Sequence, residues 1–101
     1  MIRITFVYEG TEFESFSMRG HANSAPYGED LVCAGCSAVA LGGLNALEHP
    51  DDFDIKTEEG VLEVKAKTAV TLHDQTVLST IERQLESLAF SYPKNVRLER
   101  K

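Results

Sequence analysis

The sequence predicts an α+β fold, a small and mostly antiparallel sheet with two helices packed on it, in the order ββαββαβ. Several segments repeat apolar residues at every second position, which is typical of strands, and two longer segments carry apolar residues at helical spacing. The 101 residues are 43% hydrophobic and 26% charged, as in ordinary globular proteins. Since domains commonly contain about 100–150 residues, we expect residues 1–101 to form a single domain.

The first hairpin is expected at the N-terminus. Over residues 2–8, large apolar side chains recur at every second position, as in a half-buried strand. Residues 9–10 provide a turn, and residues 11–19 are the partner strand, with Phe16 and Met18 on one face. The two segments together predict a β-hairpin.

A loop and a helix follow the hairpin. Residues 20–29 (GHANSAPYGE) are rich in turn formers, and a connection of this length more often carries function than a short one does. Residues 30–48 then predict a helix, with Asp30 at its start and Pro50 after its end. Its large apolar residues surround the whole circumference, so we expect this helix to be buried on most sides. These residues are Leu31, Val32, Val39, Leu41, Leu44 and Leu47.

The second half of the chain is expected to contain another hairpin, a second helix and a last strand. Residues 51–57 and 61–67 predict another hairpin, and the turn between them contains Gly60. Residues 72–90 predict a second helix with one apolar stripe, and residues 94–98 predict a short last strand. The stripe consists of Leu78, Ile81, Leu85 and Leu88.

The first predicted helix also contains glycines, each of which costs roughly 1 kcal/mol of helix stability relative to alanine. A packing or functional reason should offset that cost, since a glycine lets another backbone approach closely. We therefore expect Gly42 and Gly43 to lie at a close contact, with a homodimer interface as one candidate.

Charge and hydropathy exclude several classes of protein. Ten basic and sixteen acidic residues give a net charge of −6, which disfavours direct nucleic-acid binding. No apolar run approaches the roughly 18 residues that a membrane-spanning helix needs. The alternating N-terminus lacks the pattern of a signal peptide, so we expect an intracellular, cytoplasmic protein without a membrane partner.

Cys33 has the position of a reactive cysteine. It falls in the first turn of the first predicted helix if that helix begins near Asp30. The amides of a first turn have no partner within the helix, and together with the helix dipole they place partial positive charge there. This environment favours the thiolate, which is the nucleophilic form of cysteine.

His21 is a candidate partner for that thiolate. It lies twelve positions before Cys33, between the second strand and the loop. A loop of this length can bring the imidazole beside the sulfur, where it can hold the ion pair and donate a proton to a leaving amine. Asp30 can either orient His21, as the carboxylate of a triad does, or cap the helix, and residue types favour the cap.

The order of these residues resembles a known family. Gly20-His21-Ala22, a short loop ending in Pro-Tyr-Gly-x-Asp, the run Leu-Val-Cys-Ala-Gly-x-Ser-Ala-Val and Asn45 in a glycine-containing helix are similar to the Prp family. These are bacterial ribosomal-processing cysteine proteases. The match is close over residues 20–45, and the order of strands and helices agrees over nearly all of the chain.

The resemblance implies an activity and a set of residues. The nucleophile of the family falls on Cys33, its histidine on His21, and the aspartate three positions before the nucleophile on Asp30. The family removes a short N-terminal extension from a large-subunit ribosomal protein, cutting just after paired aromatic residues. The family fold is a small α/β sandwich, and its members are usually dimers. Many relatives have a small residue without a thiol at the position that Cys36 occupies in this chain.

We therefore expect a cysteine endopeptidase that needs no metal or cofactor. The first-turn amides near Cys33 are candidate oxyanion donors. The loop is expected to move to admit the substrate, and Tyr27 is a candidate for stacking on an aromatic residue of that substrate. The proposed substrate loop comprises Ala22, Ser24, Pro26, Tyr27 and Gly28.

Three alternatives remain open. Cys33 and Cys36 have the spacing of a thiol–disulfide redox pair, although the first two strands form a hairpin and not the start of a thioredoxin-like unit. A zinc site would need both cysteines, His21 and either His49 or His73, but we expect His49 at the helix C-terminus and His73 at the start of the second helix. A noncatalytic ribosome-associated module would use an acidic cluster. That cluster consists of Asp51, Asp52, Asp54, Glu58 and Glu59.

Overall fold

A computed structural model describes residues 1–21 and 30–101 of the chain. Its elements are β1 (Ile2–Glu9), β2 (Glu12–Gly20), α1 (Leu31–Leu44), a short 3₁₀ helix η1 (Pro50–Asp52), β3 (Phe53–Glu58), β4 (Val61–Ala66), α2 (Leu72–Ser91) and β5 (Val96–Arg100). Apart from η1, this is the predicted order of strands and helices. In these two ranges, no helix has the length and apolar character to cross a membrane.

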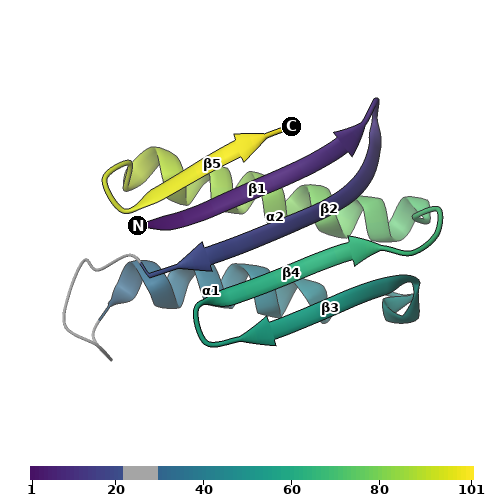
Figure 1. Cartoon of the computed structure of the whole chain (residues 1–101), viewed down its shortest axis with the longest axis horizontal. Coiled ribbons are helices and arrows are strands. Elements are labelled where there is room, and N and C mark those ends of the chain that lie inside the picture. Colours follow the sequence, from purple (N-terminus) through teal and green to yellow (C-terminus); the bar gives the residue numbers. More distant parts are fainter. Residues whose placement is uncertain (22–29) are drawn as a thin grey trace.

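In the described residues the strands form one five-stranded sheet in the order β3-β4-β2-β1-β5. All neighbouring pairs are antiparallel except β1 and β5, which are parallel. Figure 1 shows α1 and α2 side by side on one face of this sheet. The prediction of an α+β fold with a mostly antiparallel sheet and two helices is therefore confirmed.

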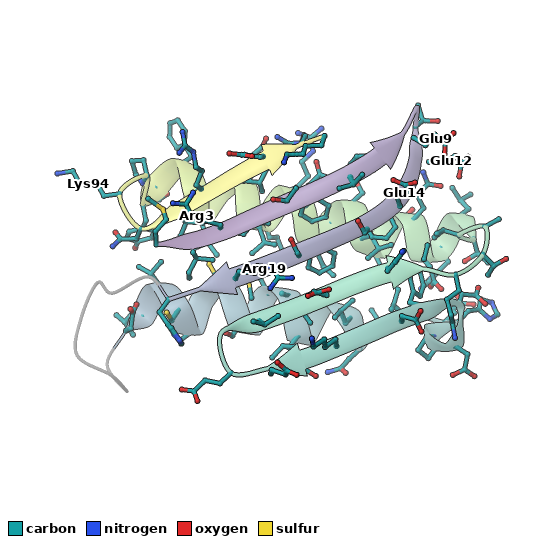
Figure 2. All side chains as sticks on the ribbon, in the orientation of Figure 1. Arg3, Glu9, Glu12, Glu14, Arg19 and Lys94 are labelled. Carbon is teal, nitrogen blue, oxygen red and sulfur yellow. The ribbon has the colours of Figure 1, made fainter. Side chains whose placement is uncertain are left out.

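The core lies between the sheet and the two helices. Ile4 and Phe6 of β1 and Phe16 of β2 are buried against the helices, and the Phe6 and Phe16 rings stack with their centroids 4.9 Å apart. Burying each such side chain stabilises the fold by roughly 1.5–3 kcal/mol. The residues between them point the other way, so Arg3 and Arg19 lie opposite each other on the uncovered face (Figure 2).

Glu82 connects α2 to two strands. The hydroxyl of Tyr8 on β1 donates a hydrogen bond to one of its carboxylate oxygens, and Nε of Arg100 on β5 donates to the other at 2.5 Å. Burial and the bond to Glu82 raise the pKa of Tyr8 well above its ordinary value. Tyr8 therefore remains a donor, and the bonds hold β5 and β1 against the helix.

The first helix ends earlier than predicted, at Leu44 rather than at residue 48. The next three amides donate to carbonyls three residues back, at 3.0–3.2 Å, so the last turn tightens. The amides of Glu48 and His49 then donate to the buried carboxylate of Asp74 on α2, at 2.8 and 3.0 Å. These bonds hold the chain against α2, so His49 lies beyond the helix and does not cap it.

The expectation that the first helix is buried on most sides is wrong for the single chain. Its buried residues are Val32, Cys36 and Ala40, all on one side of α1. Leu31 is 82% exposed and Leu41 is 44% exposed. In the described part of the chain, α1 packs against the sheet and α2 only, so part of its apolar surface stays open.

Candidate active site

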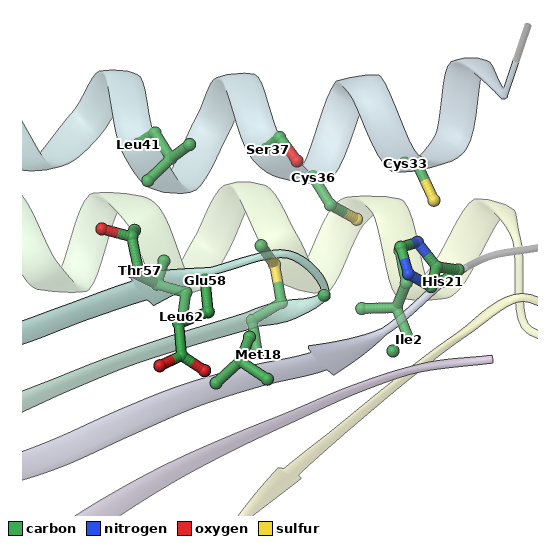
Figure 3. Close-up of a pocket in the computed structure, with 13 residues that line it drawn as sticks. Ile2, Met18, His21, Cys33, Cys36, Ser37, Leu41, Thr57, Glu58 and Leu62 are labelled. Atoms are coloured by element: carbon green, nitrogen blue, oxygen red, sulfur yellow. The ribbon is translucent and has the colours of Figure 1, made fainter. Parts of the chain in front are cut away.

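His21 and Cys33 line the same cavity. His21 follows directly on β2, and Cys33 lies in the first turn of α1. The cavity has a volume of about 120 Å³ and opens between α1 and the ends of the strands. In Figure 3 the sulfur of Cys33 points from the helix toward the imidazole of His21. The fold thus brings together the two side chains that the sequence analysis paired.

The remaining walls of the cavity are mostly apolar. The sheet contributes Ile2, Met18, Val61 and Leu62, and Leu41 of α1 lies on the other side (Figure 3). The polar side chains are Ser37, Thr57 and Glu58, and the backbones of Gly20 and Gly60 complete the lining. The surroundings of the Cys33 sulfur are therefore mainly apolar.

Asp30 caps the helix that carries Cys33. One oxygen of its carboxylate accepts hydrogen bonds from the amides of Val32 and Cys33, each at 3.0 Å. The amide of Ala34 donates to the carbonyl of Asp30, also at 3.0 Å. All three amides are engaged within the chain. These three first-turn amides, which we expected as candidate oxyanion donors, therefore already have acceptors in this structure.

The backbone before His21 requires glycine. Gly20 has φ +96°, and a Cβ at this position would lie 2.4 Å from the carbonyl oxygen of Met1. The amide of Gly20 donates to the carbonyl of Gly60 at 2.8 Å, and the amino nitrogen of Met1 donates to the carbonyl of His21 at 2.5 Å. The glycine before His21 thus has a steric reason, and hydrogen bonds from Met1 and to Gly60 hold the backbone of the two residues.

Cys36 lies one turn after Cys33 and is fully buried. Burial, together with the smaller effects of the nearby Cys33 and Asp30, raises the pKa of the Cys36 thiol to about 11. Cys36 therefore stays a neutral thiol at physiological pH. The structure holds both cysteines without a disulfide.

Several predicted residues are not brought to this cavity. His73 lies at the start of α2, as expected, where its ring contacts the carbonyl of Ala46 at 3.1 Å and the carboxylate of Glu48 at 3.0 Å. The zinc set is therefore not assembled, and among the described residues no group of three or more potential ligands gathers. The proposed substrate loop of Ala22, Ser24, Pro26, Tyr27 and Gly28 lies outside the described residues.

The acidic residues do not form one cluster. Asp51 and Asp52 belong to η1, whereas Glu58 and Glu59 lie at the other end of β3. Between them, Asp54 is 3.9 Å from the ammonium of Lys67. The acidic surface proposed for a noncatalytic module is thus spread along an edge strand. Figure 2 shows another acidic group, Glu9, Glu12 and Glu14, around the β1–β2 turn.

Sequence reasoning missed the contribution of the β3–β4 hairpin to the cavity. Thr57, Glu58 and Gly60 line it, although they lie more than twenty residues from Cys33 in the sequence. The only local signal was the turn that contains Gly60. No spacing or periodicity indicates that this turn folds onto the end of β2.

The chain is similar to known proteins of one family. The family model described as "Cysteine protease Prp" matches residues 1–97. The ribosomal processing cysteine protease Prp of Staphylococcus aureus is 34% identical over 89 residues, which cover 83% of each chain. The Prp of Mycoplasma genitalium is 33% identical over 79 residues, which cover 77% of this chain and 79% of that protein.

Solved structures of the same family have a similar fold. The Staphylococcus aureus protease in complex with a covalently linked product peptide superposes with a TM-score of 0.91 at 29% identity, over the whole of both chains. The same protease with a substrate peptide superposes with a TM-score of 0.78 at 27% identity, also over both whole chains. From the family match, the sequence identity and the shared fold, we conclude that this chain belongs to the Prp family of ribosomal processing cysteine proteases.

Proposed function

We propose that this protease removes a short N-terminal extension from a large-subunit ribosomal protein, with Cys33 as the nucleophile and His21 as the acid and base. The observation that carries the assignment is the cavity that both side chains line, at the start of α1. Cys33 lies in the first turn of α1, and an imidazole beside its sulfur completes a cysteine–histidine pair.

The chemistry follows from these two groups. The thiolate of Cys33 attacks the scissile carbonyl carbon, the C–N bond breaks, and the imidazolium of His21 gives its proton to the leaving amine. A water then attacks the thioester while His21 takes a proton from it. The carboxylate product leaves, and the thiolate and imidazolium are restored.

The cavity walls support a substrate with an apolar residue at the cleavage site. Ile2, Met18 and Leu62 surround the space beside Cys33. The family resemblance implies cleavage just after paired aromatic residues. The Staphylococcus aureus relative has been solved with a substrate peptide and with a covalently linked product peptide, which supports peptide binding and a covalent step in this chain.

The direct test is to incubate the protein with the extended ribosomal protein and to read the new N-terminus by mass spectrometry. We expect one cut, immediately after the paired aromatic residues of the extension. A peptide in which both aromatics are replaced by alanine should remain intact. If the extended protein is not cut, or if processing in cells continues with Cys33→Ala, a noncatalytic ribosome-associated module becomes the better description.

The role of Asp30 can be separated by charge. Asparagine caps helices about as well as aspartate does, so Asp30→Asn should keep the stability within about 0.5 kcal/mol. If Asp30 acts as the cap, this variant also keeps kcat/KM within about threefold, since the two caps are nearly equivalent. Asp30→Ala should lose about 1 kcal/mol of unfolding free energy in urea denaturation. A large loss of kcat in Asp30→Asn at unchanged stability would instead assign it to orienting His21.

Cys36 distinguishes hydrolysis from the redox alternative. Because its thiol is buried and its pKa is raised to about 11, Cys36 is a poor nucleophile at neutral pH. We expect Cys36→Ser to keep peptide cleavage within about threefold while removing any dithiol–disulfide cycling. Cleavage and insulin-reductase assays on the same sample measure both. Loss of cleavage in a folded Cys36→Ser protein would contradict this assignment.

We also propose that the chain forms a homodimer that covers the open side of α1. Leu31 and Leu41 are exposed there, and a Cβ added at Gly42 would meet nothing within 4 Å, so a partner has room to approach. Sedimentation at micromolar concentration should give a dimer, and Leu31→Asp should shift it toward the monomer. A monomer at all concentrations would exclude this proposal.

A further inference from the structure

We propose that Gly60, in the turn between β3 and β4, is a positioning residue for the imidazole of His21. A Cβ built at Gly60 would lie 3.1 Å from Nε2 of His21, 3.6 Å from Cε1 and 3.8 Å from Cδ2. The turn therefore lies beside one edge of the ring, and the ring atom nearest to this Cβ position is a nitrogen that can carry the catalytic proton. This inference rests on the proposed function, because it assigns His21 a proton-transfer role.

The turn is also fixed to the backbone that carries His21. The carbonyl of Gly60 accepts the 2.8 Å hydrogen bond from the amide of Gly20, the residue before His21. Gly60 thus accepts a hydrogen bond from the main chain beside the imidazole, and an added side chain at this position would meet the ring. The register of β3 and β4 in the sheet fixes the position of this turn. The turn therefore limits where the imidazole of His21 can lie, although that side chain is otherwise exposed in the described residues.

Gly60 and Cys33 belong to different elements beside the imidazole. Both line the cavity, and in Figure 3 the ring lies between the first turn of α1 and the strand ends. A methyl group at residue 60 would occupy space that the ring now uses, so Nε2 must move by a few tenths of an ångström. Such displacements matter, because proton transfer and ion-pair formation depend on the relative position of the two groups.

The chain offers a matched control in its other tight hairpin turn. Gly10 has φ +62° and Gly60 has φ +72°, so both occupy the left-handed region in which side chains are strained. A Cβ at Gly10 would meet nothing within 4 Å. Alanine therefore imposes the same kind of backbone strain at both positions, but only at residue 60 does it also meet the imidazole.

The experiment compares Gly60→Ala with Gly10→Ala in peptide cleavage. We expect similar small losses of Tm, a decrease of about 10-fold in kcat for Gly60→Ala, and a change of less than about twofold for Gly10→Ala. The pH dependence of Cys33 alkylation by iodoacetamide should also change in Gly60→Ala only, because a displaced imidazole holds the thiolate less well. A rise in KM alone, with kcat and alkylation unchanged, would make Gly60 a wall of the substrate site and overturn the proposal.

Asparagine variants keep the test decisive if alanine lowers stability too far. Asparagine tolerates the left-handed region, so Gly60→Asn and Gly10→Asn carry less backbone strain and the same contrast in space. If kcat and alkylation in the Gly60 variants match those of the Gly10 variants while His21→Ala is inactive, only the positioning role fails. If His21→Ala itself still cleaves, the proposed pair of catalytic residues fails.

Discussion

Cys33→Ala is expected to abolish cleavage of the extended ribosomal protein, and His21→Ala to lower kcat/KM by about 10³-fold or more. Without the sulfur there is no nucleophile to form the thioester. Without the imidazole, the thiolate loses its counter-ion and the leaving amine loses its proton donor. Because the two groups act as a unit, the double variant should be no worse than Cys33→Ala alone.

Two controls separate chemistry from folding. Cys36→Ala removes the neighbouring thiol, and His49→Ala removes the exposed histidine that directly precedes η1. Both variant proteins should cleave at close to the original rate. Cys33 is half-buried and His21 is exposed, so neither site variant opens a large cavity, and thermal unfolding should stay within a few degrees. If both site variants cleave at the original rate, the assignment of the two residues is wrong.

Gly43→Ala should destabilise the fold by about 2 kcal/mol, the cost of overpacking a filled core. A Cβ at this position would lie 2.5 Å from Cγ1 and 2.8 Å from Cδ1 of Ile81 on α2. Ile81 is 1% exposed, so it has little room to move away. The expected net loss of about 2 kcal/mol already includes the gain of up to about 1 kcal/mol that alanine brings to the helix over glycine.

Gly42→Ala is the matched control with the opposite sign. It lies in the same turn of α1, but its added Cβ would meet nothing within 4 Å, so only the gain in helix propensity of up to about 1 kcal/mol remains. Urea unfolding of both variants measures the difference. Equal stabilities of the Gly42→Ala and Gly43→Ala proteins would show that Ile81 moves aside at little cost, which would contradict the prediction. Repeating the measurement at two protein concentrations separates any contribution of Gly42 to dimer contacts.

These glycines also show what the sequence can and cannot predict. The helical glycines indicated a close contact, and Gly43 makes one, but with α2 of the same chain. Alternation in the strands and the apolar stripe of α2 predicted most elements, because an element buried on one face has apolar residues at regular intervals in its sequence. The predicted end of α1 was wrong because the chain after the helix is held by Asp74, a buried carboxylate far along the sequence that accepts from the amides of Glu48 and His49.

The site divides in the same way. His21 and Cys33 could be named because their residue types and the position at a helix start indicate chemistry. The contribution of Gly60 could not, since a glycine in a turn is usually explained by its backbone conformation alone. The engagement of the Cys33 amide by Asp30 also depends on the carboxylate's orientation, which residue type does not determine.

The pairing of β5 with β1 has a consequence for how the protein comes into being. These strands stand at opposite ends of the chain, yet they are parallel neighbours in the sheet. While the chain is being synthesised, the outer edge of β1 has no partner until the C-terminal segment emerges, and an open edge invites wrong pairings with other chains. Among the described strands, β5 is thus synthesised after all the others and covers the open edge of β1.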